Sequence, residues 1–255
     1  MNRPVGRCLV PVYFMGLSVF ASVAHAQTGA ASPFGILDNS FLVEEAFNQE
    51  AGIFQNIFVI TRSREGAWGG SFTQEWPIRS VRHQASYTVP FSIVDGTGEV
   101  GEVAFNYRFQ VWEEGPGWPA FAPRISVGVP TSAPRRRAEG LSWQANLPFS
   151  KAAGRVYLHG NAGGTFADDR TVPFVAGSAI VAVSPLFNLM FESLVLSAPG
   201  DEDREVTWVV SPGLRAGWNI GPQQVVAGLA LPVTRGAARD AAVLGYLSYE
   251  LPFRK

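Results

Sequence analysis

The chain has 255 residues, a formal net charge of −1 and only 16% charged residues. A near-neutral chain without a basic stripe argues against nucleic acid as a partner, and soluble domains usually carry about a quarter of charged residues. The 27 glycines and 18 prolines favour many short strands and turns over a helical bundle.

The first 26 residues have the three parts of a secretory signal peptide. Arg3 and Arg7 supply a positive start, residues 8–23 are apolar, and residues 24–26 (Ala-His-Ala) form an A-x-A cleavage site. We therefore expect residues 1–26 to be removed and the mature protein to begin at Gln27. An uncleaved membrane anchor fits less well, because the apolar stretch is short and small residues follow it.

Residues 27–50 lack the alternation of a strand. Residues 38–40 (Asp-Asn-Ser) are of the types that cap a short helix, with Glu44 and Glu45 in its first turns. Phe41 and Phe47 nevertheless form no apolar stripe, so we interpret residues 27–50 as an arm that precedes the strands.

Strand-length stretches recur from about residue 51 to the C-terminus. Apolar and polar residues alternate within them, as where Phe105 and Tyr107 flank Asn106, so that one face meets apolar and the other polar surroundings. Twelve strands are predicted, at residues 51–61, 69–78, 83–94, 101–112, 120–130, 141–150, 154–166, 174–184, 187–197, 205–218, 222–233 and 241–253.

Residues 171–191 carry no charge and are long enough for a membrane-spanning helix. They contain Pro173, Gly177 and the pair Ser184-Pro185, and their apolar residues are mostly β-branched or aromatic. We therefore predict two strands that are joined by a turn at residues 185–186.

The polar faces of the strands carry mostly Ser, Thr, Asn and Gln with isolated Arg, and lysine is nearly absent. A soluble β-sandwich or lipocalin-like barrel would need many charged residues on its outer face, so the apolar face is expected to point outward into lipid. The fold class is therefore predicted as all-β: a transmembrane antiparallel up-and-down β-barrel of about 12 strands over residues 51–255, with residues 27–50 as a short N-terminal periplasmic arm or plug. The expected location is the cell outer membrane.

The predicted connections support this barrel, because transmembrane barrels have longer loops on one side and short periplasmic turns on the other. An even strand number places both ends of the barrel in the periplasm. Longer polar loops are expected at residues 62–66, 95–99, 130–140, 167–170, 199–204 and 234–240, and tighter turns at 78–82, 115–117, 151–153, 185–186 and 219–222.

The last strand ends in an aromatic residue, as the closing strand of an outer-membrane barrel does. Tyr249, Leu251 and Phe253 share its apolar face and are predicted to form the C-terminal assembly signal that the barrel assembly machinery reads. Arg254 and Lys255 extend past this pattern and are expected to hang into the periplasm, because charges held in hydrocarbon are costly.

Ionisable and polar residues on the inward face are expected to line the lumen, because a charge that faces lipid costs about 2–4 kcal/mol at the midplane. The lumen-facing candidates are Glu75, Arg108, Arg124, His159, Asn161, Glu192 and Glu250. Tryptophan prefers membrane interfaces, and the candidates for an aromatic girdle are Trp68, Trp76, Trp112, Trp118, Trp143, Trp208 and Trp218.

No metal site and no cofactor are expected. The only cysteine, Cys8, lies in the signal peptide, and the mature chain has two histidines, His83 and His159, with no partner at ligand spacing.

Residues 158–164 (LHGNAGG) loosely resemble outer-membrane lipid hydrolases, in which a serine nucleophile needs a nearby histidine. No serine lies within two residues of His159, and nothing in the sequence places Ser150 or Ser178 against it, so a structural role is preferred and no enzyme is predicted. The basic residues 135–137 (Arg-Arg-Arg) are of the type that binds lipopolysaccharide phosphates; a solvated loop is the simpler interpretation.

Five segments resemble a family of outer-membrane transporters that is labelled as the MetA-pathway of phenol degradation. They are residues 39–50 (NSFLVEEAFNQE), 72–77 (FTQEWP), 122–124 (APR), 129–131 (VPT) and 146–150 (NLPFS). The resemblance covers most of the mature chain and implies transport, without catalytic residues.

We therefore expect an outer-membrane channel for passive uptake of small, apolar or aromatic molecules. The alternatives are a structural or surface-interaction barrel without transport activity and, third, a lipid hydrolase. The expected partners are outer-membrane lipid and lipopolysaccharide, the barrel assembly machinery and a small-molecule solute, and the expected oligomeric state is a monomer.

Overall fold

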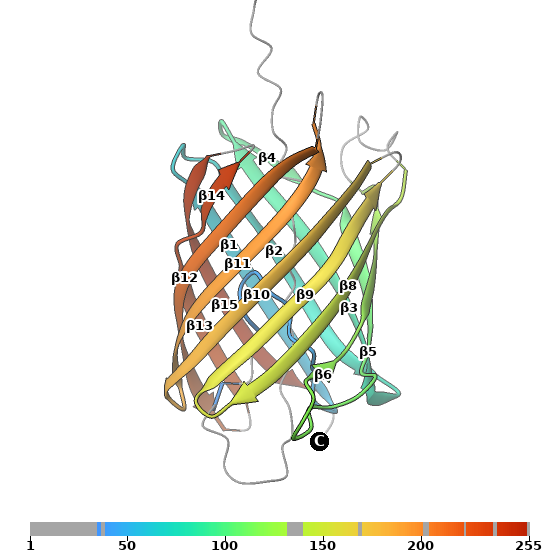
Figure 1. Cartoon of the computed structure of the whole chain (residues 1–255), viewed down its shortest axis with the longest axis vertical. Coiled ribbons are helices and arrows are strands. Elements are labelled where there is room, and N and C mark those ends of the chain that lie inside the picture. The colour runs from blue at the N-terminus through green and yellow to red at the C-terminus, as the bar shows by residue number, and fades with distance from the viewer. Residues whose placement is uncertain are drawn as a thin grey trace, which may run out of the picture.

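The computed structural model describes residues 35–253, apart from 37–38, 132–139, 168–169, 201–203, 222 and 237–238. Over these residues the chain forms a closed antiparallel β-barrel of 12 strands. This confirms the predicted fold class. Figure 1 shows the strands tilted around the barrel. The described residues contain no helix that could cross a membrane. The signal peptide, the arginines at 135–137, Arg254 and Lys255 lie outside the described residues.

Fifteen strand segments in the described chain make up the barrel, because three strands are interrupted. β4 and β5 both pair with β3, β6 and β7 both pair with β8, and β13 and β14 both lie between β12 and β15. The segments are β1 (Ile53–Ser63), β2 (Trp68–Ile78), β3 (Ser80–Val94), β4 (Thr97–Val100), β5 (Val103–Phe109), β6 (Ala120–Phe121), β7 (Arg124–Val129), β8 (Ser142–Ala153), β9 (Val156–Ala167), β10 (Arg170–Ser184), β11 (Phe187–Pro199), β12 (Arg204–Ile220), β13 (Gln223–Ala230), β14 (Val233–Gly236) and β15 (Asp240–Pro252).

The first and last strands close the barrel. β1 pairs with β15 along its whole length, from Ile53 opposite Pro252 to Ser63 opposite Ala242. Closure gives the edge strands partners, which a sheet in lipid requires because hydrocarbon offers no hydrogen bonds. We call the end at which β1 begins and β15 finishes the base, and the opposite end the rim (Figure 1).

The alternating sequence decides which face points outward. In β5, Phe105 and Tyr107 are exposed, whereas Asn106 and Arg108 are buried. The large hydrophobic side chains exposed on the barrel are Phe, Trp, Tyr, Leu, Ile and Val. Among the buried residues, polar and charged ones outnumber hydrophobic ones. The apolar face therefore points away from the barrel and the polar face into its lumen.

The connection after β3 is tighter than predicted. Asp95 and Gly96 both have positive φ angles, of 50° and 76°, and β4 resumes at Thr97. Asp-Gly is a favoured pair for two-residue hairpin turns that need positive φ at both positions. The prediction of a loop over residues 95–99 is therefore wrong.

Two connections at the base also differ from the prediction. β8 runs on to Ala153 and turns at Gly154, whose φ is 62°, so the turn expected at residues 151–153 is misplaced. The turn expected at 115–117 is part of a longer connection from residue 110 to 119, in which Gly115 forms a β-bridge with Trp118. The strict alternation of long and short connections is therefore wrong as well.

Residues 171–191 form most of β10, the turn at 185–186 and the start of β11, as predicted. The short helix considered after residues 38–40 does not form: the described residues 39–50 are bends and irregular backbone.

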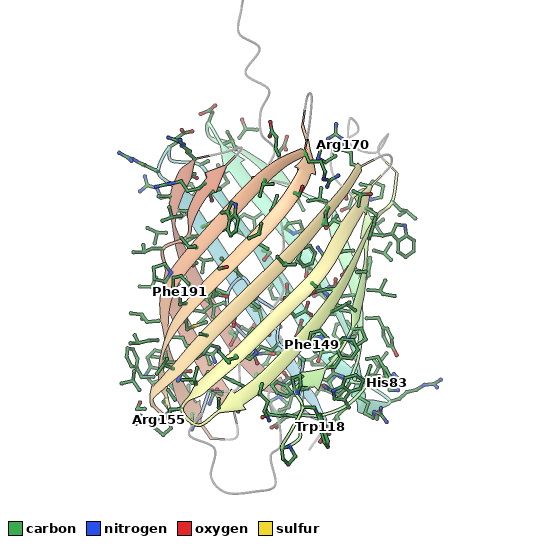
Figure 2. The ribbon with its side chains drawn as sticks, viewed as in Figure 1. His83, Trp118, Phe149, Arg155, Arg170 and Phe191 are labelled. Carbon is green, nitrogen blue, oxygen red and sulfur yellow. The ribbon has the colours of Figure 1, made fainter. Side chains whose placement is uncertain are left out.

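The tryptophans lie toward both ends of the barrel. Trp68, Trp143 and Trp208 are near the rim, and the others, including Trp118 in Figure 2, are near the base. Trp76 packs against Phe54 and Tyr87 with ring centroids 5.9 and 6.2 Å apart, and the other six are exposed. A role as a membrane girdle stays a prediction.

The closing strand is packed from outside by aromatic rings. Phe253 lies 4.3 Å from Phe54, and Tyr249 stacks with Phe58 at 6.3 Å. The backbone N–H of Phe253 donates to Gly52 O at 2.8 Å, which ties the end of β15 to the start of β1.

We predict that Phe253→Ser lowers the amount of folded barrel in the outer membrane, because the seam loses the ring contact with Phe54. An aromatic pair contributes about 0.5–1.5 kcal/mol beyond its buried area. The measurement is the mobility of unboiled against boiled outer-membrane samples on a denaturing gel. Deleting Arg254 and Lys255 is the control and should leave assembly intact; an equal loss in both variants would show that the closing strand is misplaced.

Candidate transport lumen

The described residues 35–36 and 39–50 run inside the barrel, and we call them the plug segment (Figure 1). At the base, the N–H of Gly35 donates to Pro185 O at 2.8 Å, and Gln224 Nε2 donates to Gly35 O at 2.8 Å. The described residues 39–49 are almost all buried, and the N–H of Gln49 donates to Gln84 Oε1 at 2.5 Å before the chain enters β1.

Wall side chains bond to the backbone of the plug segment. The N–H groups of Leu42 and Val43 donate to Glu192 Oε1 at 2.7 and 3.1 Å, and Arg215 Nη1 donates to Asn39 O at 2.5 Å. A buried backbone outside any helix or sheet must find such partners, because an unpaired N–H or C=O group is costly.

Three more wall residues continue this pattern toward β1. Asn161 acts like a peptide group: its Oδ1 accepts from the N–H of Glu44 at 2.8 Å and its Nδ2 donates to Glu44 O at 2.7 Å. The N–H of Ala46 donates to Ser150 Oγ at 2.8 Å, and Gln110 Nε2 donates to Ala46 O at 2.9 Å. The wall is therefore complementary to the segment's main chain.

The side chain of Glu44 enters a site with two arginines. Its Oε1 lies 2.6 Å from Arg108 Nη2, and its Oε2 lies 3.2 Å from Arg124 Nε and 2.6 Å from Asn146 Nδ2. The side chains of Glu44, Arg108 and Arg124 are 1%, 2% and 3% exposed, so these ion pairs are buried. A buried pair tolerates the loss of one member poorly, because the remaining charge is left without compensation.

Hydrophobic side chains anchor the plug segment as well. Phe41 packs against Tyr246 with ring centroids 4.9 Å apart, and a Cβ on Gly228 would lie 2.2 Å from the Phe41 ring. Ile36 takes the space above Gly217, where a Cβ would lie 2.8 Å away, and Phe47 contacts Tyr157 at 5.7 Å. The absence of a side chain at these two glycines makes room for the segment.

The lumen wall has two unlike halves. From β1 to β9 its buried side chains are mainly polar, whereas from β10 to β15 apolar and polar side chains are mixed, nine apolar against seven polar in the described strands. The first group includes Gln55, Thr73, Ser86, Thr88, Asn106 and Ser126; the second includes Phe174, Ile180, Met190, Leu194, Val226 and Leu244.

All seven lumen candidates from the sequence lie on the inward face. Five of them are bonded to the plug segment or paired with it: Arg108, Arg124, His159, Asn161 and Glu192. Glu75 is buried and accepts from Gln84 Nε2 at 2.9 Å, and the half-buried Glu250 accepts from the N–H of Gln224 at 3.2 Å near the base. Their part in solute passage stays a prediction.

Sequence reasoning missed the plug's own ligand, Glu44, and the wall residues Asn146, Ser150 and Arg215. Asn146 and Ser150 are on the polar face of a predicted strand and follow from the alternation alone. In β12 the inward residues around Arg215 include Gly213, which hides the period-2 signal. Glu44 has no such signal, because its segment is not a strand.

Ser150 and His159 face each other across β8 and β9, with Ser150 Oγ 2.8 Å from His159 Nδ1. Glu45 Oε1 lies 3.6 Å from His159 Nε2 on the other side of the ring. The sequence did not place Ser150 against His159. Ser178, the other serine considered, is opposite His159 on β10, and its hydroxyl lies 2.8 Å from Ser40 Oγ. Ser150 also accepts from the backbone of the plug segment, so Ser150, His159 and Glu45 belong to the contacts that hold this segment.

Within the part of the chain that the structure describes, no three His, Cys, Asp or Glu side chains are grouped so as to hold a metal ion.

The fold is that of known outer-membrane channels. An outer membrane channel from Pseudomonas putida F1 superimposes with a TM-score of 0.61 at 9% identity, over 80% of this chain and 97% of that one. The KdgM porin superimposes with a TM-score of 0.53 at 9% identity, over 76% of this chain and 98% of that one. At such identities the likeness concerns the fold. No family model and no curated protein sequence matches the chain.

We predict that Phe41→Ala raises the open fraction of the lumen. Burying a phenylalanine side chain is worth about 1.5–3 kcal/mol, so the ratio of displaced to seated plug should rise roughly tenfold to a hundredfold. Single-channel conductance in planar bilayers measures this ratio.

Phe191→Ala is the matched control, because Phe191 is 53% exposed on the outward face (Figure 2). Its conductance should equal that of the wild type. If the control opens the lumen as often as Phe41→Ala does, the ring of Phe41 is not an anchor.

Proposed function

We propose that this protein is a channel of the Gram-negative outer membrane, exported by the signal peptide at residues 1–26, for passive uptake of small, apolar or aromatic molecules. The observation that carries the proposal is the plug segment. It fills the lumen of a barrel whose fold is that of channels, and it is held by reversible side-chain contacts. The state described is therefore the closed one.

The apolar side chains on the β10–β15 side of the lumen wall support the substrate class. Phe174, Leu194 and Leu244 are among these side chains. Pockets for small molecules are mostly apolar with a few polar groups. A purely polar lumen would favour hydrated solutes instead.

The resemblance to the transporter family labelled as the MetA-pathway of phenol degradation agrees with this function, and we propose membership on the residues 39–50 that form most of the plug segment. We further propose outer-membrane lipid, lipopolysaccharide and the barrel assembly machinery as partners, and a monomer as the working form.

A structural or surface-interaction barrel without transport is the second candidate, and one observation favours it. The plug segment and the wall side chains together fill the middle of the lumen, as the burial of residues 39–49 shows. A barrel of about 12 strands lies between packed eight-stranded and open sixteen-stranded cases.

Flux separates the two candidates. The wild type and a variant that lacks residues 36–49 are placed in vesicles with lipopolysaccharide in the outer leaflet, which slows the direct entry of apolar molecules. We expect the variant to admit the aromatic probe N-phenylnaphthylamine several-fold faster than empty vesicles do, and the wild type to lie between them.

The control is a sugar of similar size, methyl glucoside, which should gain less from the deletion than the aromatic probe. Equal rates for the variant and for empty vesicles, with a folded barrel shown by its gel mobility, would favour the structural barrel. A greater gain for the sugar would reject the apolar substrate class.

The lipid hydrolase is tested separately, because Ser150, His159 and Glu45 lie in the order of a catalytic triad, with Ser150 on Nδ1 and Glu45 on the Nε2 side, the reverse of the usual arrangement. The plug covers Ser150, which is 1% exposed. We expect no fatty acid release from lipopolysaccharide or phospholipid by the wild type or by the variant without residues 36–49. Release that is abolished by both Ser150→Ala and His159→Ala would make the protein an enzyme.

A further inference from the structure

We propose that Arg108, Arg124 and Asn146 form a carboxylate-binding site for an amphipathic solute, which takes the place of the Glu44 side chain when the plug segment moves. The inference rests on the proposed channel function and names the chemistry of its solute: an apolar or aromatic body that carries a carboxylate.

The three side chains form one row across neighbouring strands. Arg108 of β5 is directly opposite Arg124 of β7, and Arg124 is directly opposite Asn146 of β8. Their polar groups therefore converge on one point of the lumen, where one oxygen of the Glu44 carboxylate accepts from Arg108, and the other accepts from Asn146 and forms an ion pair with Arg124 at 3.2 Å. Such a set is specific for a planar anion, because each oxygen has its own donor.

Like charges directly opposite each other in a sheet destabilise it. The two guanidinium groups are buried, which removes the screening by water. Glu75 is the wall carboxylate that also interacts with Arg124, so the wall contributes two positive charges and one negative charge. Glu44 brings this group to neutrality.

Glu44 is part of the plug segment and leaves with it. The wall then keeps a net positive charge at the row, and opening costs free energy unless another anion enters. A carboxylate solute neutralises this charge, and it thereby competes with Glu44 of the plug segment for the same donors.

The wall opposite this row would contact the apolar or aromatic body of the solute. Half a circuit of the barrel from β5, β7 and β8 lie β12, β13 and β15. The buried side chains of β13 and β15 include Val226, Leu244 and Tyr246, and those of β12 include Ser211 and Arg215. Phe41 of the plug occupies this side in the closed state, with its ring 4.9 Å from Tyr246. The plug therefore presents a carboxylate to one wall and an aromatic ring to the other, and an aryl carboxylate has the same two parts.

The test uses the full chain with Glu44→Gln, which removes the competing charge. Benzoate, its neutral isostere benzamide, and acetate are compared by flux into vesicles and by their block of ion current in planar bilayers. We expect benzoate to act at roughly tenfold lower concentration than benzamide, since charge-assisted hydrogen bonds are stronger than neutral ones. Acetate should act more weakly than benzoate.

Adding Arg124→Gln to Glu44→Gln should abolish the difference between benzoate and benzamide, whereas adding Arg62→Gln, at the exposed rim, should preserve it. Folding is checked by the mobility of unboiled samples. If the Arg124 variant does not fold, two tests replace it. Asn146→Ala is added to Glu44→Gln in its place, and the reversal potential of Glu44→Gln is measured in a salt gradient, where we expect a shift toward anion selectivity.

Equal action of benzoate and benzamide in Glu44→Gln would overturn the carboxylate site and leave the channel standing. Equal action of acetate and benzoate would overturn the amphipathic solute. Failure of all three probes to cross, in Glu44→Gln and in the variant without residues 36–49, would instead overturn the channel itself.

Discussion

The need of every buried backbone N–H and C=O group for a hydrogen-bond partner is the constraint on which this structure depends. Each strand of the barrel has a partner on both sides, and the pairing of β1 with β15 completes the circuit. The plug segment meets the same constraint in another way, because it joins no strand ladder. Side chains such as Glu192, Asn161 and Arg215 replace the missing ladder, which explains why the inner wall is rich in buried polar groups.

Period-2 alternation was sufficient to predict the barrel and the inward position of residues such as Arg108 and Asn161. Each is on the polar face of a strand whose apolar face is clear. Strand ends were harder, since alternation tells which face a residue occupies and not where the strand stops. At Asp95-Gly96 and at Gly154 the backbone turns through positive φ angles, and these local preferences override the pattern.

Contacts between distant residues were beyond the sequence. The meeting of Ser150 with His159 depends on the register between β8 and β9, which the turn at Gly154 sets. The place of Glu44 depends on three strands at once, β5, β7 and β8. The sequence therefore reached the lining of the lumen but not what fills it, because an irregular segment has no periodic signal.

The attachment of the plug segment gives the barrel a mechanical direction. Gly35 is bonded at the β10–β11 turn, and Glu50 leads into β1, so the described segment enters and returns at the same end. Both ends of the described segment are therefore held at the base, so a pull from the base side acts along both attachments, whereas a pull toward the rim would stretch them. Force from the base side is therefore the efficient way to unseat it.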